Sequence, residues 1–185
     1  MSVTKIQDFD ITTVKEEDVF FLDTNILFFI HSGYYMQTSS EFTEYSNIVQ
    51  RILSNGNNIY VSALNIQELL NGIENKEYLL YIRANSLNKH SFTKKDFRNN
   101  ATLRLNVKNK LLIVIQEIEC AYKIVEGGNI SLSLTKNFVT NYEKHHYDPM
   151  DYYLIKNTLD YADSVTYITD DKDFQFDPCI SVITK

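Results

Sequence analysis

Val19-Phe20-Phe21-Leu22-Asp23-Thr24-Asn25-Ile26-Leu27 is the stretch that decides the fold of this chain. Its four leading apolar residues predict a buried strand, and the residues that follow Asp23 predict a short helix over 24–31. Asp23 therefore stands at the carboxyl end of a strand, where open α/β sheets place their chemistry. A second junction of this kind comes late in the chain, where the apolar stretch 165–169 runs directly into two acids. Two acids at neighbouring strand ends can hold a divalent cation.

The rest of the chain alternates between short apolar runs and helical periodicity. We expect further strands at 59–61 and 180–183, a helix over 40–55 and another helix that Ser62 caps. Asp148-Pro149 is typical of a helix start, because Asp148 can cap and proline suits the first turn. Strands separated by helices, without hairpin signals, predict a three-layer α/β/α sandwich with a mostly parallel central sheet.

Residues 76–147 show mostly helical patterns. Thr93 and Asp96 have the spacing of a capping box, and we expect a long helix that ends at Gly127-Gly128. No linker or repeat divides the chain, so we expect residues 1–185 to form a single domain with a helical, basic insertion at about 76–147.

Composition narrows the class of protein. No apolar run is long enough to cross a bilayer and residues 1–14 lack a basic-then-apolar leader, so we expect a cytoplasmic protein without membrane contact. Cys120 and Cys179 have no histidine at metal-ligand spacing, which argues against a zinc site or a disulfide framework and favours packed, reduced thiols.

Four acids follow one another in the order that a shared site would require: Asp23, Glu68, Asp151 and Asp171. Each also has a structural interpretation, since Asp23 can cap a helix and Glu68 can be a solvated helix position. Asp148 and Asp151 share a helix face, and either could be the third acid. Because Asp148 is explained as a cap, we favour Asp151.

Clustered carboxylates repel one another, so several in one pocket are costly unless a cation neutralises them. Mg²⁺ and Mn²⁺ prefer carboxylate and water oxygens. A bound ion of this kind activates water and stabilises the oxygens of a phosphodiester. The four acids therefore predict a site for Mg²⁺ or Mn²⁺, with one or two ions.

These motifs resemble those of PIN-domain nucleases, from residue 18 to the end of the chain. The segment 22–27 is similar to the first motif of that family and 62–69 to the second, while 151–155 and 168–174 resemble the third and fourth. The resemblance implies that Asp23, Glu68, Asp151 and Asp171 form a metal-binding, catalytic pocket. Asn25, Thr169, Asp148 and Asp173 would be supporting residues. VapC-type toxins of this family are more compact than this chain over 76–147, so an antitoxin partner and a homodimer are expectations that the resemblance only suggests.

The middle of the chain is also basic. Between Arg83 and Lys110, eight basic residues accompany one acid, although the whole chain has a net charge of -6. We expect this segment to bind phosphates while Phe92 and Phe97 stack on bases; a solvated helix face is the alternative. The candidate phosphate-binding residues are Lys89, Lys94, Lys95, Arg98, Arg104 and Lys108.

The sequence thus predicts a metal-dependent endoribonuclease that hydrolyses RNA by metal-activated water, with DNA not excluded as substrate. Its role could be that of the toxin of a toxin-antitoxin pair or of a defence or RNA-processing nuclease. A haloacid-dehalogenase-like phosphatase is an alternative, but it expects a second Asp where Asn25 stands. The other alternative is a catalytically silent PIN-like module that binds RNA or protein.

Overall fold

The computed structural model describes residues 2–35, 39–126, 131–141, 148–162, 164–176 and 180–185. Within these residues a six-stranded sheet has the order β1-β6-β5-β2-β3-β4, and every strand pairing is parallel. The strands are β1 (Val3–Lys5), β2 (Phe20–Leu22), β3 (Ile59–Ser62), β4 (Lys123–Val125), β5 (Val165–Ile168) and β6 (Ile180–Thr184). The expected parallel sheet is confirmed.

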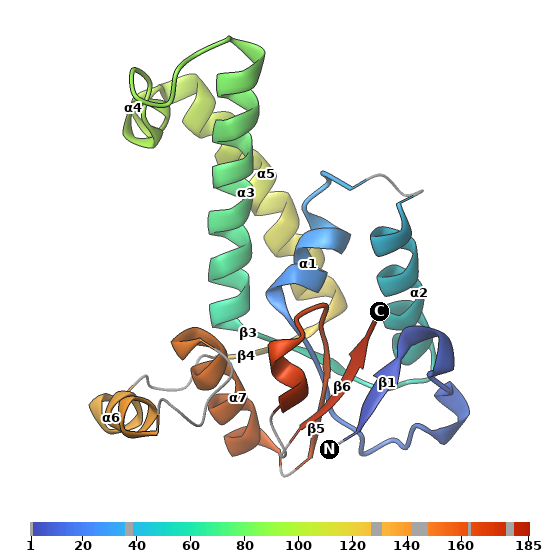
Figure 1. Ribbon diagram of the computed structural model, residues 1–185. Coiled ribbons are helices and arrows are strands. Elements are labelled where there is room, and N and C mark those ends of the chain that lie inside the picture. The colour runs from blue at the N-terminus through green and yellow to red at the C-terminus, as the bar shows by residue number, and fades with distance from the viewer. Residues whose placement is uncertain (1, 36–38, 127–130, 142–147, 163, 177–179) are drawn as a thin grey trace.

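Helices cover both faces of this sheet (Figure 1). They are α1 (Thr24–His31), α2 (Ser40–Ser54), α3 (Ala63–Ala84), α4 (Lys94–Asn99), α5 (Ala101–Ala121), α6 (Leu132–Thr140) and α7 (Pro149–Tyr161). Residues of α1, α2, α3 and α5 pack with one face of the sheet into the larger core, and residues of α6 and α7 pack with the other face. The predicted three-layer α/β/α architecture is therefore confirmed.

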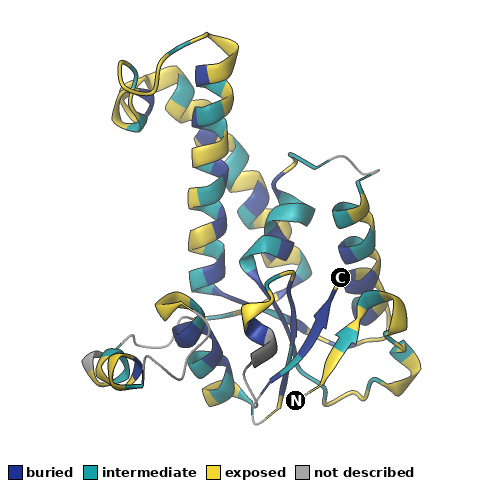
Figure 2. Ribbon diagram, viewed as in Figure 1, coloured by how far each residue is buried: buried dark blue, intermediate teal, exposed yellow. Residues whose placement is uncertain are grey.

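Strand β2 explains why the opening apolar stretch has no polar alternation. Phe20 and Leu22 belong to the core beneath α1 and α2, whereas Phe21 belongs to the core beneath α7. All three side chains are buried, as Figure 2 shows for the centre of the sheet. A parallel strand covered on both faces needs apolar residues at every position.

Helix starts follow the expected capping chemistry. The side chains of Asp23, Ser62 and Asp148 each accept a hydrogen bond from a backbone N–H in the first turn of α1, α3 and α7. Thr93 and Asp96 form the predicted capping box at the start of α4. The local sequence therefore fixes where these helices begin.

Two edge strands were not predicted, and one helix end was predicted wrongly. The long helix does not continue to Gly127-Gly128, which lie outside the described residues; α5 ends at Ala121, and Lys123–Val125 forms β4 beside Tyr60–Ser62. At the other edge, β1 pairs with β6. Three-residue edge strands carry too short a pattern to be recognised, and pairing with a neighbour decides their conformation.

The outer half of α3, helix α4 and the first half of α5 form an arm, residues 74–110, that projects from the sheet (Figure 1). Tyr78, Ile82, Phe97 and Val107 form a small core of its own inside this arm. The arm corresponds to the first part of the helical insertion expected at about 76–147. Residues 127–130 and 142–147 of that range lie outside the described residues. No helix in the described part of the chain is long and apolar enough to span a membrane.

Candidate active site

A cavity of about 370 Å³ lies at the carboxyl end of the central strands. β2 and β5 are neighbours in the sheet, so Asp23 after β2 and Asp171 after β5 emerge at the same edge. Helices α3 and α7 begin near this edge and contribute the other acids. The described lining residues are Asp23, Thr24, Asn25, Phe28, Glu68, Leu69, Gly72, Asp148, Asp151 and Asp171. All four predicted acids therefore line one cavity, together with Asn25 and Asp148.

Asp23 is the most enclosed of these acids, with only 7% of its surface exposed. Its Oδ1 accepts a hydrogen bond from the Thr24 backbone N–H at 2.6 Å, and its Oδ2 accepts one from the Thr169 hydroxyl at 2.6 Å. Burial raises the pKa of Asp23 to about 6, although the hydrogen bonds from Thr169 and Thr24 oppose the rise and Asp171 and Glu68 add to it. Asp23 is thus both the cap of α1 and a member of the acid cluster.

Asp148 and Asp151 have different roles, and the sequence left open which of them caps α7 and which is the third acid of the cluster. Oδ1 of Asp148 accepts hydrogen bonds from the backbone N–H groups of Met150 and Asp151, so Asp148 is the helix cap. Burial raises the pKa of Asp151 to about 8, and the charges of Asp148, Asp23, Asp171 and Glu68 contribute to the rise. The carboxyl of Asp151 therefore binds a proton far more tightly than an ordinary aspartate does.

Glu68 lies on the first turns of α3 and is hydrogen-bonded to Thr24, which is hydrogen-bonded in turn to Asn65; the sequence singled out neither of these two residues. The Thr24 hydroxyl donates to Glu68 Oε2 at 2.7 Å and accepts a hydrogen bond from Asn65 Nδ2 at 3.0 Å. Asn65 is buried, with 1% of its surface exposed. A polar residue on the apolar face of α3, three positions before an acid, was the signal that could have found it.

The acids after β5 have separate roles. Tyr45, which is fully buried, donates its hydroxyl to Asp170 Oδ1 at 2.7 Å. Asp171 lines the cavity, and its Oδ1 accepts a hydrogen bond from the Asp173 backbone N–H at 2.8 Å. The Thr169 hydroxyl, which is bonded to Asp23, also accepts from the Asp171 backbone N–H at 2.9 Å. Thr169 and Asp173 thus support the site from behind and are not among its described lining residues.

The described lining of the cavity holds five carboxylates and no basic side chain. Oxygen donors of this kind suit a hard cation such as Mg²⁺ or Mn²⁺. The pKa values of Asp23 and Asp151 are raised mainly by burial, and the charges of the neighbouring acids add to the rise. As the side chains stand, however, no group of three or more Asp, Glu, His or Cys residues among those described is arranged to hold a metal ion. The chemistry of the donors therefore fits a cation, whereas the described positions of the side chains do not enclose one.

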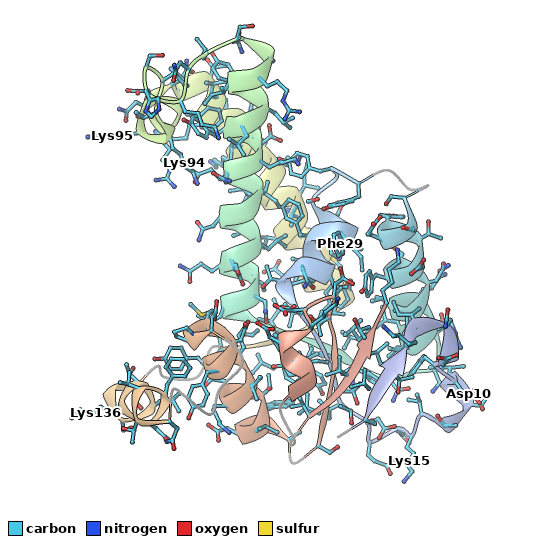
Figure 3. The ribbon with its side chains drawn as sticks, in the orientation of Figure 1. Asp10, Lys15, Phe29, Lys94, Lys95 and Lys136 are labelled. Atoms are coloured by element: carbon cyan, nitrogen blue, oxygen red, sulfur yellow. The ribbon has the colours of Figure 1, made fainter. Side chains whose placement is uncertain are left out.

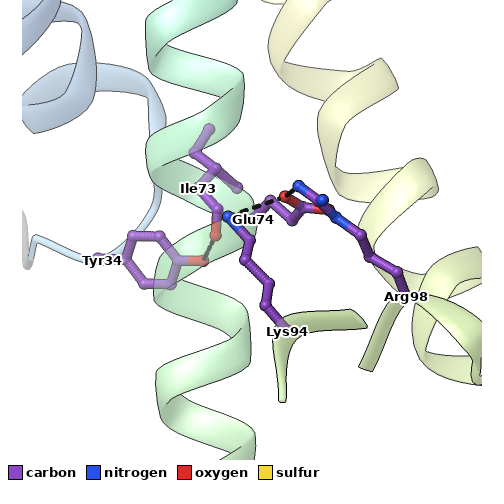
Figure 4. Close-up of polar contacts among 5 residues, drawn as sticks. All are labelled: Tyr34, Ile73, Glu74, Lys94 and Arg98. Carbon is purple, nitrogen blue, oxygen red and sulfur yellow. Dashed lines mark hydrogen bonds and ion pairs between the residues drawn. The ribbon is translucent and has the colours of Figure 1, made fainter. Parts of the chain in front are cut away.

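The basic residues of the arm are not equally available. Lys94 Nζ lies 3.0 Å from Glu74 Oε2, and Arg98 pairs with both oxygens of the same carboxylate (Figure 4). This pairing with Arg98, together with Lys94, lowers the pKa of Glu74 to about 2. Figure 3 shows Lys94 and Lys95 at the outer end of the arm, away from the sheet. The exposed candidates outside this ion-pair group are Lys89, Lys95, Arg104 and Lys108.

Two smaller expectations are wrong. Phe97 is 3% exposed and packs inside the arm, so it offers no surface for stacking on a base. Phe92 is half-buried against the same core.

The cysteines were expected to be packed thiols. Cys120 is exposed on α5 and is not packed, while Cys179 lies outside the described residues.

Comparisons with known proteins identify a similar fold and nothing more. No protein-family profile and no curated protein matches the chain. Among solved structures, the chain is similar to a chain in the crystal structure of VapBC2 from Rickettsia felis bound to a DNA fragment from their promoter, with a TM-score of 0.53. The sequences are 16% identical, and the match covers 89% of this chain and 96% of the other. At this identity the likeness establishes a shared fold and leaves the activity to the site itself.

Proposed function

We propose that this protein is a metal-dependent nuclease that hydrolyses phosphodiester bonds of RNA. The observation that carries the proposal is the convergence of Asp23, Glu68, Asp151 and Asp171 on one cavity, with the pKa values of Asp23 and Asp151 raised. Acids that are buried beside other acids are costly to keep in a fold, which favours a functional purpose. The fold shared with a VapBC2 chain supports a nuclease in general terms and does not bear on the metal or the substrate.

In this proposal Asp23 and Asp171 would be the principal ligands of Mg²⁺ or Mn²⁺. When bound, such a cation would supply an activated water and neutralise the charge of the phosphate. Thr169 keeps the Asp23 carboxylate in position, and Thr24 does the same for Glu68. Glu68 and Asp151, which line the same cavity, would complete the set of ligands or orient the water.

A phosphatase of the haloacid-dehalogenase type is less well supported by the geometry. That chemistry needs a second carboxylate two residues after Asp23. Asn25 occupies this position, where its Oδ1 lies 3.5 Å from the Asp170 backbone nitrogen that donates to it. The second alternative is a protein that only binds RNA or another protein. Binding alone does not require several acids to converge on one cavity.

The test is incubation with RNA and DNA oligonucleotides, with and without Mn²⁺. The native chain should cleave RNA only with the metal, and Asp23→Asn should abolish cleavage while it keeps the fold. Asp160→Asn is the matched control, because Asp160 is an exposed acid near the other end of α7. Cleavage by Asp23→Asn at the native rate would refute the assignment, and hydrolysis of phosphate monoesters alone would favour the phosphatase.

A protein partner is a further part of the proposal. The similar chain comes from a structure of VapBC2 with promoter DNA. This likeness supports the proposal that an antitoxin protein binds this chain and inhibits it. Homodimer formation and a cytoplasmic location remain predictions from the sequence. Sedimentation of the purified chain, alone and with the product of a neighbouring reading frame, would test both kinds of assembly.

A further inference from the structure

The cavity that holds the acids has an apolar end that the proposed reaction does not use. Phe28 lies on α1 four residues after Thr24, and Gly72 lies on α3 four residues after Glu68. Residues four apart share a helix face, so each helix presents one polar and one apolar lining residue about 6 Å apart along its axis. Leu69 is a third apolar residue of the described lining.

The Phe28 ring is held in place by other aromatic rings. It stacks on Tyr34 with ring centroids 5.7 Å apart and meets the edge of Tyr35 at 6.1 Å. Tyr34 is itself fixed, because its hydroxyl donates to Glu77 at 2.8 Å and Lys110 Nζ lies 3.9 Å from its ring centroid. Of these described residues only Phe28 lines the cavity, so the cavity has one preorganised aromatic wall.

Gly72 faces this ring from the interior of α3. Glycine is the least favourable residue after proline inside a helix, so its presence needs a local reason. A Cβ built at this position would lie 3.4 Å from Cε2 of Phe28. This distance is ordinary van der Waals contact, so glycine lets α3 pack closely against the edge of the ring. Because Gly72 also lines the cavity, a side chain longer than a methyl group would extend beside the ring into the cavity.

We propose that this apolar end binds the base of an unpaired nucleotide whose phosphate lies at the acid end. The inference rests on the proposed nuclease function and names a substrate class for it. Aromatic side chains bind bases by stacking, with little dependence on base identity. A base in a duplex is already stacked on both faces and cannot enter, so the site selects single-stranded RNA or loops. The two ends of the cavity are about one helical turn apart, a separation that one ribose can bridge.

A fluorescence experiment tests the binding of the base directly. The chain contains no tryptophan, so Phe28→Trp introduces a single indole at the aromatic wall. Titration with each ribonucleoside 5′-monophosphate in the presence of Mn²⁺ should quench its fluorescence in a saturable manner. Phe29→Trp is the matched control: Phe29 stacks on Tyr45 and is not among the described lining residues, so the emission of an indole there should stay unchanged.

A blocking variant provides the second measurement. Gly72→Leu replaces a poor helix former with a good one, so the thermal stability should be kept while the apolar end is filled. When Gly72→Leu is combined with Phe28→Trp, we expect nucleotide to bind roughly 5- to 150-fold more weakly than to Phe28→Trp alone, the range expected for loss of one stacked base. On single-stranded RNA, Gly72→Leu alone should raise KM more than it lowers kcat.

The two proposals fail in different ways. If the native chain cleaves RNA with Mn²⁺ but the emission of Phe28→Trp does not respond to any nucleotide, the base site is wrong and the nuclease stands. If nucleotides quench Phe28→Trp and Gly72→Leu prevents the quenching, the base site stands even when no substrate is cleaved and the nuclease is wrong. Equal responses of Phe28→Trp and Phe29→Trp would also overturn the base site.

Discussion

The Thr169 hydroxyl donates a hydrogen bond of 2.6 Å to Asp23 Oδ2 across 146 positions of sequence. The same hydroxyl accepts from the Asp171 backbone N–H, so one buried side chain connects the acid after β2 with the acid after β5. Thr169 has no exposed surface. The relative position of these two acids is therefore set by the pairing of two strands and by one side chain between them.

Replacing Thr169 with valine should loosen this connection. The change leaves a buried carboxylate oxygen and a backbone N–H without their partner, at a cost of about 1–3 kcal/mol, which for a chain of this length lowers Tm by roughly 2–12 °C. Thr169→Ser keeps the hydroxyl and should recover most of the loss. Calorimetry of both variants measures the difference, and equal Tm values for valine and serine would contradict the role of the hydroxyl.

The acid cluster should make the metal-free protein less stable as pH rises. Burial and neighbouring charges raise the folded pKa of Asp23 to about 6 and of Asp151 to about 8, from an ordinary value of 3.8. A raised pKa means that the folded state holds the proton more tightly, so this stabilisation is complete below about pH 4 and is lost as pH rises through 6 and then 8. Urea unfolding at pH 5, 6.5 and 8 should show the decline. Asp151→Asn should flatten its upper part, and an unchanged slope in that variant would rule out Asp151 as the source.

A divalent cation should restore the stability that the metal-free protein loses when its clustered acids ionise. With Mn²⁺ at about 100 times its Kd, binding to the folded state alone adds about 2.7 kcal/mol, so Tm at pH 8 should rise and a chelator should return it to the starting value. Asp23→Asn should raise the metal-free Tm, because it removes one buried charge, and should reduce the response to Mn²⁺. Asp160→Asn should respond as the native chain does. A native Tm that does not depend on Mn²⁺ would remove the metal site.

The ion pairs of Glu74 should hold α4 against α3. Glu74→Gln removes the charge that both Lys94 and Arg98 face. Partly exposed pairs are worth about 0.2–1 kcal/mol each, so we expect little change in the global Tm. Hydrogen exchange within Lys94–Asn99 should become faster while exchange in β5 stays the same. Uniform acceleration across the chain would show that the pairs stabilise more than the arm.

The exposed cations of the arm should contribute to RNA binding through phosphates. Substituting Lys89, Lys95, Arg104 and Lys108 with glutamine should reduce the dependence of log K on log salt by about 0.7 for every phosphate that the variant no longer neutralises. Lys94→Gln should change it less, because Lys94 already pairs with Glu74. Binding curves at several salt concentrations, with a catalytically inactive variant, would measure this. A slope that the fourfold change leaves intact would identify the arm as a solvated surface.

Much of the fold followed from local patterns. The apolar run before Asp23 predicted a buried strand, and capping residues at 23, 62, 93 and 148 predicted where helices begin. Both kinds of signal act within a few residues, so the sequence contains them directly. The short edge strands β1 and β4 were not predictable in this way, because pairing with a distant neighbour supplies their hydrogen bonds.

The site shows the same division. The sequence determined which acids stand at strand and helix ends, because strand ends and helix caps have local signatures. Only the tertiary structure decided that Thr24 bonds to Glu68 and Asn65 to Thr24. The same is true of the ion pairs that Glu74 forms with Lys94 and Arg98, and of the apolar lining that Phe28 and Gly72 form beside the acids. These relationships join residues from different elements, and the packing of α1, α3 and the arm brings them together.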